Sequence, residues 1–207
     1  MTIEELQEKY GDVEVYVIEN ESVGNVGFKD SFKTVLPQFE TLVDDQFNDC
    51  GFYMKRCEAE IDPTFRQIIP YCLVKFEDYY FVTKRLDGDS RLIGKTVIGI
   101  GGHIERPIEN TNNPVSYSLH RELEEELNLG LGEETVEKVT LVGVIKSDAS
   151  EVDSVHLGLI YIVDVGTWDI TVKETEILEG LWVHVDDLKG YSDNWETWSK
   201  ICIEKVA

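Results

Sequence analysis

The sequence predicts an α/β protein in which helices pack on the faces of one mixed β-sheet. Strand-length apolar segments recur from about residue 65 onward, many with alternating polar residues. One helical segment, 113–128, separates these strand segments into two groups, and a second, within 192–207, follows the last strand. This order differs from the regular strand–helix alternation of a parallel sheet, so we expect a mixed sheet.

The N-terminal part, 1–62, is predicted to be an extension packed on a core domain of 63–207. Its segment 14–20, EVYVIEN, has the pattern of a strand. The segment 32–47 carries apolar residues at mixed helical spacing and is interrupted by Pro37. The extension is therefore expected to be less regular than the core.

The core domain is rich in predicted strands. Segment 67–86 has the pattern of two strands joined by a turn at 76–78, and segment 95–102 that of a third strand ending in glycines. Three more strand candidates follow the first helix, at 136–147, 155–165 and 178–188.

Composition limits the partners. The 41 acidic and 19 basic residues give a formal net charge of -22, which disfavours contact with nucleic-acid backbones and anionic membranes. The first residues lack the pattern of a secretory leader, and no uninterrupted apolar segment is long enough to span a bilayer. The four cysteines lack the close pairing of a zinc site. We expect a cytoplasmic protein with reduced, mostly buried thiols.

The helix at 113–128 is well marked. Asn113 is a good N-cap, and Pro114 suits the first helical position because its missing N–H has no partner there. The helix is expected to end near Asn128, a residue that tolerates the left-handed conformation, with Gly130 as the alternative end. Its apolar stripe contains Leu119, Leu123 and Leu127.

Acidic residues line one edge of this stripe. Glu122, Glu125 and Glu126 share the edge, whereas Glu124 points elsewhere. Like charges at this spacing repel, so a bound cation would stabilise them; oxygen ligands favour Mg²⁺ first and Mn²⁺ second. Arg121 lies one turn before Glu125 and can orient a carboxylate. The alternative is an ordinary solvated acidic face.

The glycine run before the helix favours a functional site over a solvated acidic face. The run GIGG at 99–102 allows a tight turn and a close approach to another group. Glu105 follows it as a fourth acid that can fold back towards the helix. The glycines and the acidic run together point to a functional site more strongly than either does alone.

These residues resemble the motif of the Nudix hydrolases, a glycine and a glutamate followed by Arg-Glu-apolar-any-Glu-Glu. The second half is present from Arg121 to Glu126. The preceding segment is longer than the family spacing, so 106–120 contains an inserted loop, and Glu109 is the best candidate for the intermediate glutamate. Asn128 replaces the late glycine of the motif.

The likeness covers nearly the whole chain and is greatest to a bacterial and phage subgroup described as predicted phosphoesterases, which are similar to MutT. It implies a three-layer α/β/α sandwich and hydrolysis of the pyrophosphate bond in a nucleoside diphosphate linked to another group. By analogy Glu122, Glu125 and Glu126 would hold Mg²⁺, with Glu105 and the Gly102 carbonyl as additional ligands.

The catalytic base is left open between Glu125, Glu126 and two loop residues, Glu151 and Glu176. Arg121 is included in the catalytic set. Contacts to a nucleotide-type substrate are expected from Arg85, Gly101 and His103, although a structural role is the commoner one for a histidine in that position.

A homodimer formed through the N-terminal extension is a further expectation. The alternative function is a catalytically silent Nudix-like module that binds a nucleotide or a protein; the full set of carboxylates argues against it, and the lengthened loop argues for it.

Overall fold

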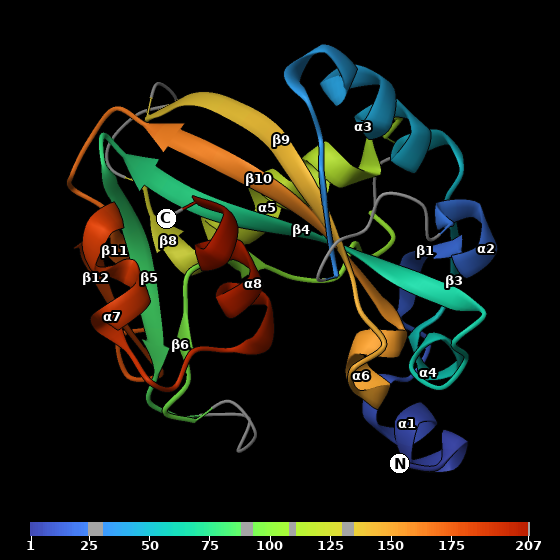
Figure 1. Ribbon diagram of the computed structural model, residues 1–207. Coiled ribbons are helices and arrows are strands. Elements are labelled where there is room, and N and C mark those ends of the chain that lie inside the picture. The colour runs from blue at the N-terminus through green and yellow to red at the C-terminus, as the bar shows by residue number, and fades with distance from the viewer. Residues whose placement is uncertain (25–30, 88–92, 108–110, 130–134, 207) are drawn as a thin grey trace. The chain divides into compact units, whose positions relative to one another are not determined.

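The computed structural model describes residues 1–24, 31–87, 93–107, 111–129 and 135–206 (Figure 1). Contacts divide the chain into two compact units, each assembled from three stretches of sequence. Unit 1 contains Met1–Pro70, Gly102–Leu119 and Leu141–Ile160. Unit 2 contains Tyr71–Gly101, His120–Thr140 and Tyr161–Ala207. The division into an extension of 1–62 and a domain of 63–207 stays a prediction.

Unit 1 contains the elements of the first 60 residues and one later helix, α6. They are α1 (Ile3–Tyr10), β1 (Glu14–Glu19), α2 (Asn20–Val23), β2 (Phe32–Thr34), η1 (Pro37–Phe39), α3 (Glu40–Asp49), β3 (Phe52–Lys55), α4 (Arg56–Ala59) and α6 (Glu151–Ser154). Strand β1 pairs antiparallel with β3 and with the first residues of β4 (Phe65–Phe76). Val15, Val17 and Ala59 form a fully buried apolar cluster here. The strand expected at 14–20 is thus present and lies in a core.

Unit 2 contains the C-terminal elements. They are β5 (Tyr79–Arg85), β6 (Thr96–Val97), β7 (Ile100–Gly101), β8 (Leu127–Asn128), β11 (Thr171–Val172), β12 (Leu178–His184), η2 (Val185–Asp187), α7 (Leu188–Tyr191) and α8 (Thr197–Val206). Strand β5 pairs antiparallel with β12 and β4. The turn between β4 and β5 contains Glu77 with φ of 52°, a left-handed conformation typical of tight turns.

The main sheet is mixed, as the sequence predicts. Its hydrogen-bonded neighbours follow the order β12-β5-β4-β10-β9-β2. The arrows of β4 and β10 (His156–Val165) point the same way in Figure 1, whereas β2 runs antiparallel to β9 (Val136–Lys146). Strands β4, β9 and β10 contain residues of both units, as does helix α5 (Pro114–Glu126).

The third strand and the closing helix differ from the sequence prediction. The strand expected at 95–102 consists of two short pieces, β6 paired with β5 and β7 paired with β4. The closing helix begins at Thr197, so Trp195, expected within it, precedes the helix and forms a bridge with Thr96. Trp195 and Trp198 are nevertheless buried, as predicted for core residues.

Helix α8 is held by polar contacts as well as apolar packing. The Ser199 hydroxyl is hydrogen-bonded to the Tyr71 hydroxyl at 2.9 Å and accepts the backbone N–H of Ile98 at 3.1 Å. The Glu196 carboxylate accepts the N–H groups of Trp198 and Ser199, which satisfies donors at the start of the helix. These contacts tie α8 to β4 and to the segment before β7.

Candidate active site

Helix α5 begins where the sequence predicts. The Asn113 side chain accepts the backbone N–H of Ser116 at 2.8 Å, and Pro114 is the first helical residue. The backbone N–H of Val115, which also has no intrahelical partner, donates to the Asn48 side chain at 3.2 Å. The start of the helix is therefore anchored within unit 1.

The apolar stripe of α5 is buried as predicted. Leu119, Leu123 and Leu127 are each 2% exposed or less. Burial of this stripe sets the rotation of the helix and so fixes which glutamates face inward. Glu122, next to the stripe, is only 8% exposed, whereas Glu124 is exposed.

Arg121 connects two of the motif carboxylates. Its guanidinium donates one hydrogen bond to Glu122 and another to Glu125, the second at 2.8 Å. The Glu125 side chain is 57% exposed, whereas those of Glu122 and Arg121 are 11% and 27% exposed. The arginine thus orients an inner and an outer carboxylate of the same edge.

Glu126 is a half-buried carboxylate with a perturbed pKa. Burial, followed by repulsion from Glu122, raises the pKa of Glu126 to about 7. Arg85 at the end of β5 opposes this shift, and the exposed Glu174 adds to it. The structure therefore places Arg85, predicted to contact substrate, in the electrostatic environment of the motif, and it adds Glu174, which the sequence did not indicate.

The end of α5 was predicted incorrectly. The helix stops at Glu126, and Leu127 and Asn128 form strand β8, which pairs with Val172 and Thr171 of β11. Asn128 is not among the residues with positive φ in the described chain. Pairing with β11 thus ends the helix in place of a left-handed residue; the alternative end, Gly130, lies outside the described residues.

Lys173 caps the C-terminal end of α5. Its backbone N–H donates to the carbonyl of Glu126 at 2.9 Å, and its ammonium group donates to the carbonyl of Glu124. Helices end with unpaired carbonyl groups, and a cation there also interacts favourably with the helix dipole. The backbone that carries the acidic edge is therefore fixed at its C-terminal end.

The acidic edge fits a hard divalent cation. Its ligand atoms are all carboxylate oxygens, the donors that Mg²⁺ and Mn²⁺ prefer. Glu122 and Glu126 are withdrawn from solvent and repel each other, a charge arrangement that a cation would relieve. We conclude that the chemistry of these residues matches the metal that the motif implies.

The glycine run lies next to a tyrosine. A β carbon on Gly99 would lie 2.1 Å from the ring of Tyr71, so only glycine fits there. Gly101 pairs with Tyr71 through β7. The interpretation of this run as a close backbone approach is correct for Gly99, and the group approached is a tyrosine ring of unit 2.

The last glycine of the run and the residues after it belong to unit 1. Gly102 begins that stretch, and Glu105 is exposed and bridged to Val15 of β1. His103 lies with its Nε2 atom 3.1 Å from Nε2 of His156. Glu109, predicted as the intermediate glutamate, lies outside the described residues.

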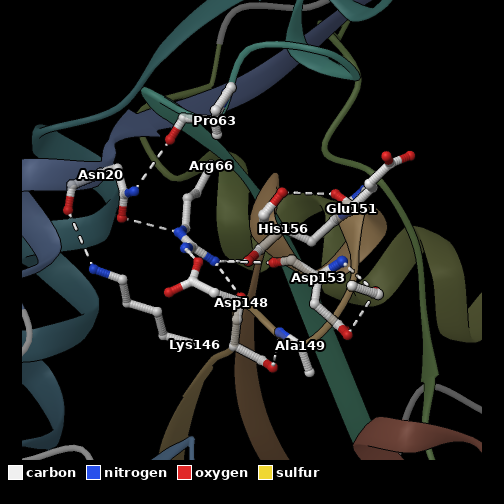
Figure 2. Close-up of polar contacts among 12 residues, drawn as sticks. Asn20, Pro63, Arg66, Lys146, Asp148, Ala149, Glu151, Asp153 and His156 are labelled. Atoms are coloured by element: carbon white, nitrogen blue, oxygen red, sulfur yellow. Dashed lines mark hydrogen bonds and ion pairs between the residues drawn. The ribbon is translucent and has the colours of Figure 1, made fainter.

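Glu151 begins the short helix α6 in unit 1. The preceding Ser150 caps this helix by accepting the N–H of Asp153 at 3.0 Å. Figure 2 shows the Glu151 side chain pointing away from the buried Arg66. Glu151 and the other loop candidate, Glu176 of unit 2, are both exposed, so solvent reaches either carboxylate.

Arg66 anchors the segment that carries Glu151. This arginine is 0% exposed, and its Nη1 atom donates to the carbonyls of Ser147, Asp153 and His156 at 2.9, 2.9 and 3.1 Å (Figure 2). Its Nε atom donates to Asn20 at 2.9 Å. Arg66 was not predicted as a functional or structural residue; the signal available was a charged residue two positions before the apolar run of 68–74.

Similarity to known proteins agrees with this architecture. No protein-family model matches the chain. Protein YmaB of Bacillus subtilis (strain 168) is 36% identical over 159 residues, which cover 73% of this chain and 76% of YmaB. The crystal structure of Tm1382, a proposed Nudix hydrolase, is similar with a TM-score of 0.74 and 27% identity, over 93% of this chain and 97% of Tm1382.

A more distant structure shares the fold alone. The Nudix domain of Shewanella oneidensis NrtR, solved with ADP-ribose, matches with a TM-score of 0.52 and 9% identity, over 68% of this chain and 85% of that domain. In the described part of the chain, no helix is long and apolar enough to cross a membrane.

Proposed function

The chain belongs to the Nudix hydrolase superfamily, whose members cleave pyrophosphate bonds, and from this premise we propose that it hydrolyses a nucleoside diphosphate linked to another group, with Mg²⁺ as its cofactor. The observation that carries the proposal is the acidic edge of α5. Glu122 and Glu126 are withdrawn from solvent together, and Arg121 holds Glu122 and Glu125. In a solvated acidic face, two carboxylates that repel each other would both be exposed, whereas here Glu122 is buried and Glu126 is half-buried.

Each residue of the edge has a proposed role. Glu122, Glu125 and Glu126 hold the cation, with Mn²⁺ as a substitute, and the Gly102 carbonyl and Glu105 are proposed as additional ligands. When bound, the cation neutralises substrate phosphate charge and lowers the pKa of a water molecule. Arg121 keeps Glu122 and Glu125 in place through its two hydrogen bonds.

The proposed base is a carboxylate with access to water. Glu125 and Glu151 are both exposed, and the segment that carries Glu151 is fixed by the Arg66 hydrogen bonds. Glu126 and Glu176 are the other two candidates. We propose that Arg85, which acts electrostatically on Glu126, also attracts substrate phosphate, with Gly101 and His103 as further substrate contacts.

The test is hydrolysis by the purified full chain. ADP-ribose, nucleotide sugars and dinucleoside polyphosphates are incubated with protein and Mg²⁺, and nucleoside monophosphate release is followed by chromatography. Glu126→Gln and Glu125→Gln are expected to lower kcat by about 100-fold or more, the typical contribution of a catalytic carboxylate. Glu124→Gln, an exposed change on the same helix, is expected to retain activity.

Two results would contradict the proposal. One is hydrolysis that survives both substitutions. The other is tight binding of a substrate without turnover under Mg²⁺ or Mn²⁺, which would support a silent nucleotide-binding module.

A further inference from the structure

Three residues that can bind metal lie together in unit 1. They are Glu60, His103 and His156, and their ligand atoms all lie within 4.8 Å of one another. We propose that they form a binding site for a divalent transition-metal ion, with Zn²⁺ as the best match. This site shares no residue with the acidic edge of α5. Of its three residues, only His103 also has a role in the proposed hydrolysis, as a substrate contact.

The spacing of the two imidazoles suits one ion. The Nε2 atoms of His103 and His156 are 3.1 Å apart. Two nitrogen ligands of a tetrahedral Zn²⁺, each bound at about 2.0–2.1 Å, are separated by about 3.3 Å. A change of a few tenths of an ångström therefore converts the hydrogen-bonded pair into a metal-binding pair.

His156 faces His103 with the ring nitrogen that can bind a metal ion, Nε2. Its Nδ1 atom lies 2.7 Å from the carbonyl of Val152, to which Nδ1–H donates. This tautomer leaves the lone pair on Nε2, the atom that faces His103.

The backbone around His156 is also fixed. The His156 carbonyl accepts a hydrogen bond from Nη1 of the buried Arg66 at 3.1 Å. The same guanidinium holds the segment immediately before the histidine (Figure 2). Ligand side chains supported by hydrogen bonds of this kind are typical of metal sites in proteins.

Glu60 provides the negative charge. It directly follows α4, and its backbone N–H donates to the Arg56 carbonyl at 3.0 Å. Its side chain is 15% exposed and contacts Arg56 Nε at 3.3 Å through one carboxylate oxygen. A carboxylate has two oxygens, so this contact orients the group while the other oxygen coordinates an ion.

The ligand set selects the class of metal. Two imidazoles and one carboxylate suit Zn²⁺ and similar transition ions, whereas Mg²⁺ prefers oxygen ligands alone. Three protein ligands leave a position for water. An ion bound here would cross-link three stretches of unit 1 that are far apart in the sequence.

The experiment measures Zn²⁺ binding to the full chain in the presence of excess Mg²⁺, which occupies the all-oxygen site. Stoichiometry is read by native mass spectrometry and affinity by competition with a chromogenic chelator. We expect one Zn²⁺ per chain. His103→Asn, His156→Gln and Glu60→Gln are expected to weaken binding by at least about tenfold, the lower limit seen even for residues that only support a ligand.

His184→Gln is the matched control, because His184 belongs to unit 2 and lies outside the cluster. It is expected to bind Zn²⁺ like the wild type. A second measurement does not depend on variants: Zn²⁺ should shift the imidazole ¹⁵N resonances of His103 and His156 in the wild-type protein.

Absence of Zn²⁺ binding by the wild type in excess Mg²⁺ would overturn the proposal. So would equal affinity in the histidine variants, or unchanged imidazole resonances. The outcome is independent of hydrolysis, because Glu126→Gln is expected to lose activity but keep Zn²⁺. A wild-type protein that hydrolyses its substrate but binds no Zn²⁺ in excess Mg²⁺ would refute this site and leave the proposed function standing.

Discussion

At the scale of single residues, Glu126 shows how a site can oppose stability. The pKa of its carboxyl group is raised to about 7 by burial and by Glu122, so its ionised form is disfavoured in the folded chain. The folded chain is therefore less stable with Glu126 charged than with a neutral side chain of the same shape.

Glu126→Gln is expected to raise the free energy of unfolding of metal-free protein at pH 8 by about 1–3 kcal/mol, since each unit of pKa shift corresponds to about 1.4 kcal/mol. Urea denaturation with a chelator present measures it. The exposed change Glu124→Gln should leave the midpoint unchanged. A lower midpoint for Glu126→Gln would show that its carboxylate stabilises the fold without metal.

Arg66 has the opposite effect, because it stabilises unit 1 through buried hydrogen bonds. Arg66→Ala leaves the carbonyls of Ser147, Asp153 and His156 without their donor. We expect a loss of about 3 kcal/mol or more in the free energy of unfolding, measured by urea denaturation.

Arg106→Ala is the control for Arg66→Ala, because Arg106 is 53% exposed and forms a surface ion pair with Glu14. Its loss is expected to be below about 1 kcal/mol. Equal effects of the two substitutions would mean that the buried hydrogen bonds of Arg66 add nothing to stability.

The residues of the acidic edge could be predicted from the sequence, but those of unit 1 could not. Helical periodicity alone brings Arg121, Glu122 and Glu125 together, because they are separated by at most one turn. Arg66 and His156 meet through pairing of β4 with β10, and no local pattern specifies which distant segments will pair. The contact between His103 and His156 could therefore not be predicted from the sequence.

At the scale of elements, the start of α5 depends on its cap. Asn113→Ala removes the side chain that accepts the N–H of Ser116. The expected loss is about 1 kcal/mol in the free energy of unfolding, and Asn113→Asp should restore most of it. Urea denaturation measures both, with the exposed Asn112→Ala as a control expected to have no effect.

The two ends of α5 show the limits of local patterns. The N-terminal cap was predicted correctly because its signals, Asn113 and Pro114, act within one turn. The C-terminal end was predicted two residues too late because strand pairing with Thr171 and Val172 determines it. The long apolar strands were easier to find than β6 and β7, which are two residues each.

At the scale of the whole molecule, the reactivity of the cysteine thiols measures how well solvent is excluded from the cores. Cys57, Cys72 and Cys202 are buried, and Cys50 is exposed. Burial raises the pKa of the Cys72 and Cys202 thiols, which lowers their thiolate fraction further. The sequence prediction that most of the cysteines are buried is confirmed.

Native protein treated with a thiol reagent is therefore expected to label at Cys50 rapidly and at the three buried thiols slower by orders of magnitude. Denatured protein should label at all four. Mass spectrometry of digests measures the sites, and Cys50→Ser should abolish the rapid phase. Rapid labelling of Cys72 would mean that the core of unit 2 opens frequently.

The mixed sheet and the α/β fold class were predicted from strand patterns. Which stretches of the chain form each of the two units was not predicted. Sequence patterns identify contiguous stretches, but each unit combines stretches from three parts of the chain. Strands far apart in sequence pair within one sheet, so no single composition change marks the boundary.

The direct passage from α5 into β8 has a consequence for insertions and deletions. Glu126 is the last helical residue and Leu127 the first of the strand, so no loop lies between them to absorb a change in length. One added residue there would shift the pairing of β8 with β11 by one position or turn the acidic edge by about 100°. Insertions and deletions at this junction should therefore not be tolerated.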